Sequence, residues 1–276
     1  MWYGVDALAE KYPNMGGYVY CAGNPVKLVD VDGNENVVVC GAQYDESSGN
    51  KLMFVNQGIR ALRQYQRNAP NESRSMVLFQ YGYTENQINE IRSSVENYGG
   101  SLILVNSVDE MASCNNRTTN KISNMEIYAH GLNHSIEFGY MCGDVSKRCS
   151  LNMDNVSIIS SNAFDGLNSH VSSFACRTGL GSDSYIWGVF TYRNKSLAQA
   201  IANVSEANVH AYAVRTDYKF TLGTWSERRF DFPNKAPQIE MIDGAAFTPQ
   251  GAAHPVQNGN SPIGIYSGFI ELNRNS

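Results

Sequence analysis

Short apolar runs alternate with amphipathic segments along most of the chain. Six runs with few charges are typical of strands covered on both faces: 36–41, 76–79, 102–105, 125–128, 171–176 and 209–214. Between them, apolar residues recur at helical spacing, and the first such stripe is Leu52, Val55, Ile59 and Leu62. Alternating strands and helices joined by short loops predict an α/β fold, with a mostly parallel sheet and helices on both faces.

Capping residues mark the starts of two further helices. Thr84 with Gln87, and Ser196 with Gln199, have the spacing of capping boxes. The helix that begins near Thr84 carries the apolar stripe Ile88, Ile91, Val95 and Tyr98. The stretch 155–164 predicts one more helix.

The helical pattern stops after Asp217. The segments 218–222 and 263–270 predict strands, and the stretch 233–262 is rich in Pro and Gly. Such a stretch predicts a surface excursion, or else a flap over a site. We expect residues 218–276 to form an irregular, β-rich part of the same domain.

Two of the strand-like runs end in reactive side chains followed by sharp turns. The first ends in His130 and Gly131, and the second ends in Cys176, with Gly179 close behind. In an open α/β sheet, ligands bind outside the carboxyl ends of the strands. We therefore expect His130 and Cys176 to face one crevice, where a Cys nucleophile meets its base. The segment 134–139 predicts a short antiparallel strand beside that crevice.

His-Gly at one strand end and Ala-Cys-Arg-Thr-Gly at the other resemble the active-site blocks of the caspase-like cysteine peptidases, the group with caspases, gingipains, clostripain and separase. His130 precedes Cys176 by 46 residues, and the caspase signature has its His roughly 50 residues upstream. Thr178 lies between Arg177 and Gly179, whereas in the caspase block Gly follows the Arg directly. The resemblance implies a caspase-like three-layer sandwich and a cysteine endopeptidase. A peptidase of this group requires no cofactor, although some of its members use calcium.

The same resemblance implies a role for each residue of the site. Cys176 is expected to be the nucleophile and His130 the general base. The backbone N–H groups of Gly131 and Cys176 are expected to form the oxyanion hole. The contrasting interpretation is structural: Cys176 would be a buried apolar thiol and His130 a polar residue with satisfied hydrogen bonds.

Residues beside the Cys strand and the next strand shape the first substrate pocket in the resembled family. Arg177, Arg215 and Asp217 occupy such positions here. Arg215 or Asp217 could select an acidic or a basic substrate side chain, or both could be solvated charges at a strand end. Asp183 and Glu137 are further candidates for this pocket.

Residues 1–35 resemble the end of the Rhs-repeat core of bacterial polymorphic toxins. The matching runs are 8–13 (Leu-Ala-Glu-Lys-Tyr-Pro), the Asn-Pro at 24–25 and the Asp-Val-Asp-Gly at 30–33. Ala7 and Val31 replace two prolines of that pattern, and Gly23 replaces an Asn. The resemblance implies that residues 36–276 are a toxic tip exported by a dedicated secretion system into a rival cell. Its partners would be a protein or peptide substrate and a cognate immunity protein.

Charge and hydropathy exclude several other classes of protein. The net charge is −5 and no Lys/Arg cluster stands out, so a general nucleic-acid surface is not expected. No run approaches the roughly 20 apolar residues of a membrane span. The first residues contain neither a basic segment nor an apolar core, so the sequence predicts no signal peptide and no membrane partner.

The remaining Cys and His residues point to no metal site. Cys142 and Cys149 could pair or bind a metal, but two ordinary thiols in a loop are the simpler interpretation. His130 and His134 are four residues apart, yet Gly131 disfavours a helix there and the Glu of a His-Glu-x-x-His site is absent. Two rival functions remain open: a non-proteolytic toxin tip, such as a nuclease or transferase, and a catalytically inert binding module.

Overall fold

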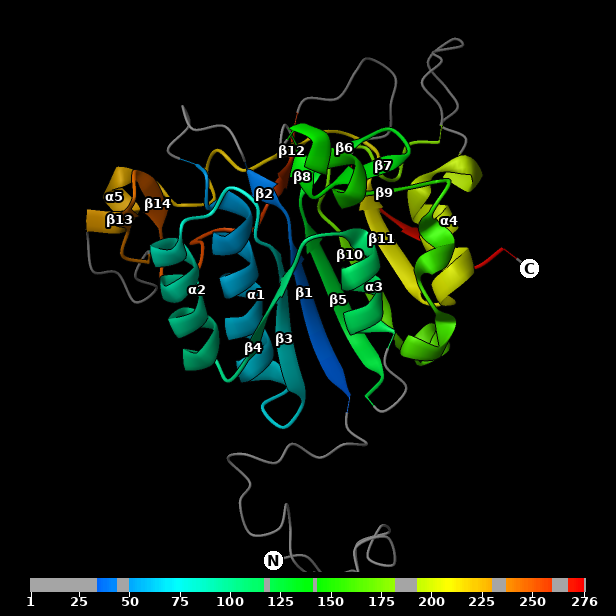
Figure 1. Ribbon diagram of the computed structural model, residues 1–276, viewed down its shortest axis with the longest axis horizontal. Coiled ribbons are helices and arrows are strands. Elements are labelled where there is room, and N and C mark those ends of the chain that lie inside the picture. Colours follow the sequence, from blue (N-terminus) through cyan, green and yellow to red (C-terminus); the bar gives the residue numbers. More distant parts are fainter. Residues whose placement is uncertain are drawn as a thin grey trace, which may run out of the picture.

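The predicted apolar runs form one central sheet of seven strands, in the order β16-β11-β10-β5-β1-β3-β4 (Figure 1). The computed structural model describes residues 34–43, 50–116, 120–140, 143–181, 193–229, 237–259 and 268–275. Its strands are β1 (Glu35–Cys40), β3 (Ser73–Phe79), β4 (Ser101–Val105), β5 (Ile122–Tyr128), β10 (His170–Ser173), β11 (Asn208–Tyr212) and β16 (Phe269–Leu272). All neighbours pair in parallel except β16, which runs antiparallel to β11. The predicted α/β fold is therefore confirmed.

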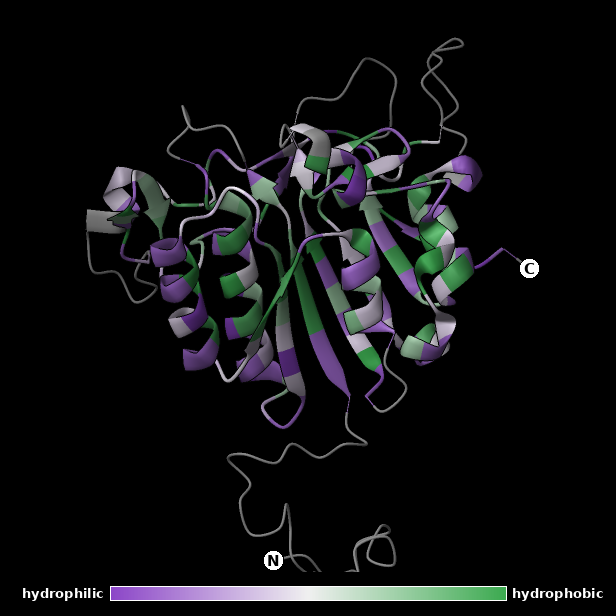
Figure 2. Cartoon of the chain, viewed as in Figure 1, coloured by the Kyte–Doolittle hydropathy of each residue, from purple (hydrophilic) through white to green (hydrophobic). Residues whose placement is uncertain are grey.

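Helices cover both faces of the sheet, as the alternation of elements predicts. The helices are α1 (Met53–Asn68), α2 (Glu85–Asn97), α3 (Val108–Asn115), α4 (Leu197–Ser205) and the short α5 (Trp225–Arg229). Val38 and Cys40 of β1 pack with α1 and α2, whereas Val37 and Val39 pack with α3 and α4. A strand buried on both faces needs apolar residues at successive positions. Figure 2 shows this concentration of hydrophobic residues along the central strands.

The helices predicted from the stripe at 52–62 and from the caps at Thr84 and Ser196 are present as α1, α2 and α4. The α1 stripe at positions 52, 55, 59 and 62 is fully buried. The capping box of Thr84 and Gln87 is present in both directions at the start of α2. At α4, the Ser196 hydroxyl accepts the Gln199 N–H, and the Gln199 side-chain amide donates to the Asn273 carbonyl oxygen.

Two predicted elements were wrong. The stretch 155–164 forms two short 3-10 turns, η4 (Val156–Ile158) and η5 (Ser161–Ala163). The Asn116 side chain bonds the backbone between them, donating to the Ile158 carbonyl oxygen and accepting the Ser160 N–H, and the Ser160 hydroxyl caps the second turn. The stretch 218–222 is a series of turns: the Tyr218 carbonyl oxygen accepts both the N–H and the hydroxyl of Thr221.

Several small sheets gather at the carboxyl edge of the central sheet (Figure 1). There β2 (Ala42–Gln43) pairs with β8 (Gly139–Tyr140), and β6, β7 and β9 form an antiparallel sheet in which β7 lies within the strand predicted over 134–139. The bounds of the remaining elements are β6 (His130–Leu132), β7 (Ser135–Glu137), η3 (Gly143–Cys149), β9 (Ser150–Asn152), η6 (Gly166–Asn168), η7 (Arg193–Lys195), β12 (Thr216–Asp217), β13 (Glu240–Ile242), β14 (Ala245–Phe247) and β15 (Gln257–Asn258).

Some predictions fall on residues that the structure does not describe. Residues 1–33 lie outside the described ranges, so the boundary between the Rhs-like segment 1–35 and the domain 36–276 stays a prediction. Asp183 and Cys142 also lie outside them. Within the described ranges, no helix combines the length and the hydropathy needed to cross a bilayer.

Candidate active site

The two predicted reactive side chains follow neighbouring strands of the sheet. β5 and β10 are parallel, with Ile127 opposite Ser173. His130 lies just beyond the end of β5, and Cys176 just beyond the end of β10. Because parallel strands end at the same edge, both residues reach the same region. That region adjoins β1, and β3 and β5 lie on opposite sides of β1 in the sheet. Open α/β sheets bind ligands at such a topological switch point.

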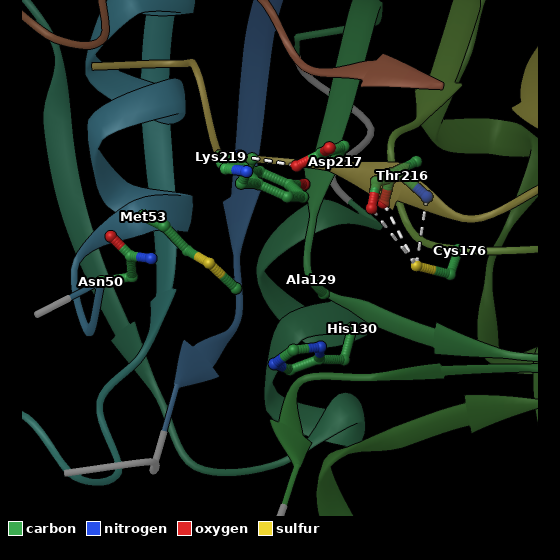
Figure 3. Close-up of a pocket in the computed structure, with 9 residues that line it drawn as sticks. Asn50, Met53, Ala129, His130, Cys176, Thr216, Asp217 and Lys219 are labelled. Atoms are coloured by element: carbon green, nitrogen blue, oxygen red, sulfur yellow. Dashed lines mark hydrogen bonds between the residues drawn. The ribbon is translucent and has the colours of Figure 1, made fainter. Parts of the chain in front are cut away.

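A cavity of about 310 Å³ opens at this edge, and both residues line it. Its lining consists of Asn50, Met53, Ala129, His130, Cys176, Thr216, Asp217, Tyr218 and Lys219. Figure 3 shows the His130 imidazole and the Cys176 thiol projecting into one space, with Thr216 and Asp217 across from the imidazole. The structure therefore brings together the two residues that the sequence singles out.

Gly131 packs its backbone directly against the backbone of Cys176. A Cβ atom at Gly131 would lie 2.3 Å from the Cys176 carbonyl oxygen and 2.7 Å from the Cys176 nitrogen. No side chain fits in that space, so Gly131 is the residue that lets β6 approach Cys176. The two residues expected to supply the oxyanion hole are consequently in contact.

The thiol of Cys176 is held by Thr216. The Thr216 N–H donates to Sγ over 3.3 Å, and the Thr216 hydroxyl lies 3.2 Å from Sγ. Thr216 belongs to β12, which is not part of the central sheet. Sequence reasoning missed this residue because a single Thr, 40 residues beyond the Cys, carries no local signal of such a contact.

The imidazole of His130 is held in an apolar setting by one hydrogen bond. Its Nε2 atom is hydrogen-bonded to the side-chain oxygen of Gln43. Because an amide oxygen can only accept, Nε2 carries the proton and Nδ1 keeps its lone pair. The ring meets Phe54 edge-on at 5.0 Å between centroids and Tyr140 at 4.6 Å. Burial lowers the pKa of His130 to about 4.

Cys176 and His130 thus have different hydrogen-bond partners. The thiol is bonded to Thr216 and the imidazole to Gln43. Among the described residues, no hydrogen bond joins the thiol to the imidazole. Catalytic hydrogen bonds often form only when the substrate is bound. The site therefore places a thiol and a neutral imidazole on one cavity, with the Gly131 backbone packed against that of Cys176.

Phe54 connects the imidazole to the other side of the cavity. This fully buried ring meets His130 at 5.0 Å and Tyr218 at 5.2 Å, edge-on to both. The Tyr218 hydroxyl donates to the Phe174 carbonyl oxygen over 3.4 Å. Burial raises the pKa of Tyr218 well above its usual value, so this phenol stays neutral.

The predicted specificity residues lie in different places. Asp217 lines the cavity, and one of its carboxylate oxygens accepts the Lys219 N–H over 2.7 Å. Arg215 is exposed and outside the lining. Arg177 is also outside it, in a left-handed conformation with φ 59°, and its N–H donates to the Val214 carbonyl oxygen.

The weaker sequence candidates lie outside the cavity lining as well. Glu137 on β7 accepts a hydrogen bond from the Ser150 hydroxyl. His134 occupies the turn between β6 and β7 with φ 66°. Cys149 is buried, and its thiol donates to the Asn106 carbonyl oxygen. In the described part of the chain, no three His, Cys, Asp or Glu side chains are grouped as metal ligands.

No protein-family model and no curated protein matches this sequence. Among solved structures, the chain is similar to a short-chain dehydrogenase/reductase from Serratia marcescens BCRC 10948. The TM-score is 0.36 at 10% identity, over 65% of this chain and 72% of the dehydrogenase. A similarity of this size carries no information about activity.

Proposed function

We propose that this chain is a cysteine endopeptidase of the caspase-like group, with Cys176 as nucleophile and His130 as general base. The observation that carries the proposal is the placement of these two residues after adjacent parallel strands, on one cavity. The backbone contact between Gly131 and Cys176 supports it further. An open α/β sheet presents a nucleophile and its base in this way at its carboxyl edge.

The reaction begins with attack of the Cys176 sulfur on the substrate carbonyl carbon. The thiol proton passes to Nδ1 of His130, and the carbonyl oxygen becomes an anion stabilised by the N–H groups of Gly131 and Cys176. The C–N bond breaks as His130 returns the proton to the leaving amine. Water then attacks the thioester, gives a proton to His130, and releases the carboxylic acid and the restored thiol.

The environment of each group sets what these steps require. His130 is neutral at physiological pH because burial lowers its pKa to about 4, so its lone pair is free but weakly basic. To take the thiol proton, its pKa must rise as the thiolate forms beside it. Gln43 fixes the tautomer that leaves Nδ1 as the base. The Cys176 sulfur must leave Thr216 to reach the substrate, and its hydrogen bonds of 3.2 and 3.3 Å are weak enough to exchange.

Covalent labelling with peptidyl acyloxymethyl ketones tests the proposal most directly. These reagents alkylate a thiol that has bound the peptide, and peptide mapping locates the modified residue. We expect stoichiometric labelling of Cys176, and its loss in Cys176→Ala and His130→Ala. Cys114→Ala is the matched control, because Cys114 is partly exposed on α3, which packs on the opposite face of the sheet from α1.

Uniform labelling of all accessible thiols, or labelling that survives His130→Ala, would contradict a dyad. Hydrolysis of a nucleic acid or transfer of a group by the Cys176→Ala protein would then support the rival toxin activities. Binding without any turnover would support an inert module.

The toxin context belongs to the same proposal and rests on the sequence of residues 1–35. In that context the domain is exported into a rival cell, cleaves a protein there, and is neutralised in the producer by an immunity protein. Expression inside a sensitive bacterium tests it. We expect growth arrest with the wild type and growth with Cys176→Ala. Arrest by both proteins would separate the toxin from the peptidase.

A further inference from the structure

The cavity wall that holds the thiol is not built by the central sheet. Thr216 and Asp217 form β12, whose only sheet partner among the described residues is β15, with Thr216 opposite Asn258. The Gly259 N–H also donates to the Arg215 carbonyl oxygen over 2.5 Å. The position of the group that contacts Cys176 Sγ therefore depends on a segment more than 40 residues further along the chain.

That segment, residues 246–259, is tied to α1; we call it the C-terminal strap. Asn56 of α1 is fully buried and bonds it three times. Its Nδ2 donates to the Ala246 carbonyl oxygen, its Oδ1 accepts the Thr248 N–H, and its carbonyl oxygen accepts the Ala252 N–H, over 2.7 to 3.0 Å. Gly251 approaches so closely that a Cβ there would lie 2.3 Å from the Arg60 nitrogen.

Gln57 is the last anchor before the strap reaches the cavity wall. Its side chain is fully buried, and Nε2 donates to the His254 carbonyl oxygen over 2.8 Å. The His254 N–H in turn donates to the Thr221 carbonyl oxygen over 2.9 Å. The connection therefore runs from Gln57 through His254 to the turns after Thr216, and by way of β15 to Thr216 itself.

We infer that Gln57 is a positioning residue for the Cys176 site, acting through the C-terminal strap to place Thr216 against the sulfur. The inference rests on the proposed function for its catalytic consequence, but the placement of the thiol is measurable without it. α1 also lines the cavity at Met53. Helix α1 thus contributes one wall of the cavity directly, at Met53, and positions the wall at Thr216 through the strap.

The β13–β14 hairpin, whose second strand leads into the strap, offers a matched control. Gln87 on α2 is also a fully buried Gln, and its Nε2 donates to the Ile242 carbonyl oxygen of the β13–β14 hairpin over 3.1 Å. Neither partner lines the cavity. Gln87 additionally caps α2, so Gln87→Met should destabilise the fold at least as much as Gln57→Met. Among the described residues, no group hydrogen-bonds to the Gln57 Oε1 atom, so Met also removes an unsatisfied group there.

A double-mutant cycle with Thr216→Val, which removes the hydroxyl contact and keeps the N–H, tests the coupling. The rate of Cys176 alkylation by iodoacetamide, located by peptide mapping and followed against pH, is the readout. We expect Gln57→Met to change this rate about tenfold alone but only about threefold in the Thr216→Val background, where the N–H contact is the one left to displace. Gln87→Met should change it under about twofold in either background.

Additive effects of Gln57→Met and Thr216→Val would overturn the inference, and so would an equal effect of Gln87→Met. Because iodoacetamide needs no peptidase activity, the cycle remains decisive if no peptide is cleaved. If peptides are cleaved, kcat and KM for the same variants give a second measure, and kcat should follow the alkylation rate. An unaltered kcat in Gln57→Met would also count against the positioning role.

Discussion

Two of the cavity's walls are held in place by different means. Ala129, His130 and Cys176 follow strands β5 and β10, which have paired neighbours on both sides and lie between two apolar cores. The wall of Thr216 to Lys219 consists of a two-residue strand and turns, tied to α1 by a few side-chain bonds. Local stability follows the density of buried contacts and ladders. Cys176 and His130 are therefore rigidly placed, whereas Thr216, which contacts the thiol, can shift separately.

Phe54→Ala should have the largest effect, because this ring touches both walls. Truncation of a fully buried Phe costs about 3–5 kcal/mol. It should also admit water beside His130 and raise the pKa of that imidazole from about 4 towards its usual 6.5, since burial is the cause of the shift. Urea unfolding and an NMR titration of His130 measure the two effects.

Phe138→Ala is the matched control for this change. Phe138 is equally buried, but its ring stacks on Phe79 at 4.4 Å in the opposite core. We expect a comparable loss of stability with no change in the His130 titration. A His130 pKa that stays near 4 in Phe54→Ala would show that the ring does not desolvate the imidazole.

Acidification should lower the free energy of unfolding through His130. This residue belongs to the wall of Ala129, His130 and Cys176, which we call the sheet-built wall; the wall of Thr216 to Lys219 is the turn-built wall. Between pH 6.5 and about 4, the unfolded chain binds a proton at this residue that the folded chain excludes. The free energy of unfolding therefore falls as the pH falls across that window, by about 3 kcal/mol at its lower end, and levels off below it. Urea unfolding of the wild type and His130→Gln at several pH values isolates the effect. Parallel pH profiles for the two proteins would refute it.

The sheet-built wall was predictable from the sequence and the turn-built wall was not. His130, Gly131 and Cys176 lie at the ends of apolar runs, and such runs reveal strands and therefore strand ends. Thr216, Gln43 and Gln57 act through contacts between short segments far apart in the chain, which leave no periodic pattern. The alternating residues at 218–222 suggested a strand, but hydrogen bonds of Asp217 and Thr221 to nearby backbone form turns there instead.

Gly131→Ala should abolish labelling of Cys176 at only a moderate cost in the free energy of unfolding, because Gly131 is where β6 contacts Cys176. A Cβ atom 2.3 Å from the Cys176 carbonyl oxygen forces two backbones apart, and overpacking of this kind costs about 1–3 kcal/mol. Labelling of Cys176 by peptidyl ketones should be lost, because the expected oxyanion donors separate. Gly166→Ala is the control: its φ is 53°, and no atom lies within 4 Å of the added Cβ. It should cost about 1 kcal/mol and leave labelling unchanged. Normal labelling of folded Gly131→Ala would remove Gly131 from the site.

Substitutions of Asp217, in the turn-built wall, should have the smallest effect on stability. Two of them, Asp217→Asn and Asp217→Ala, separate the role of its charge from that of its hydrogen bond. Asp217→Asn keeps an oxygen to accept the Lys219 N–H and removes only the charge, whereas Asp217→Ala removes both. We expect Asn to change the free energy of unfolding by less than about 0.5 kcal/mol, and Ala to lower it by about 1 kcal/mol. If the carboxylate faces the substrate side chain, Asn should also weaken labelling by ketones with a basic first residue, relative to uncharged ones. Equal labelling by both reagents in wild type and Asn would show that Asp217 shapes the turn and does not select the substrate.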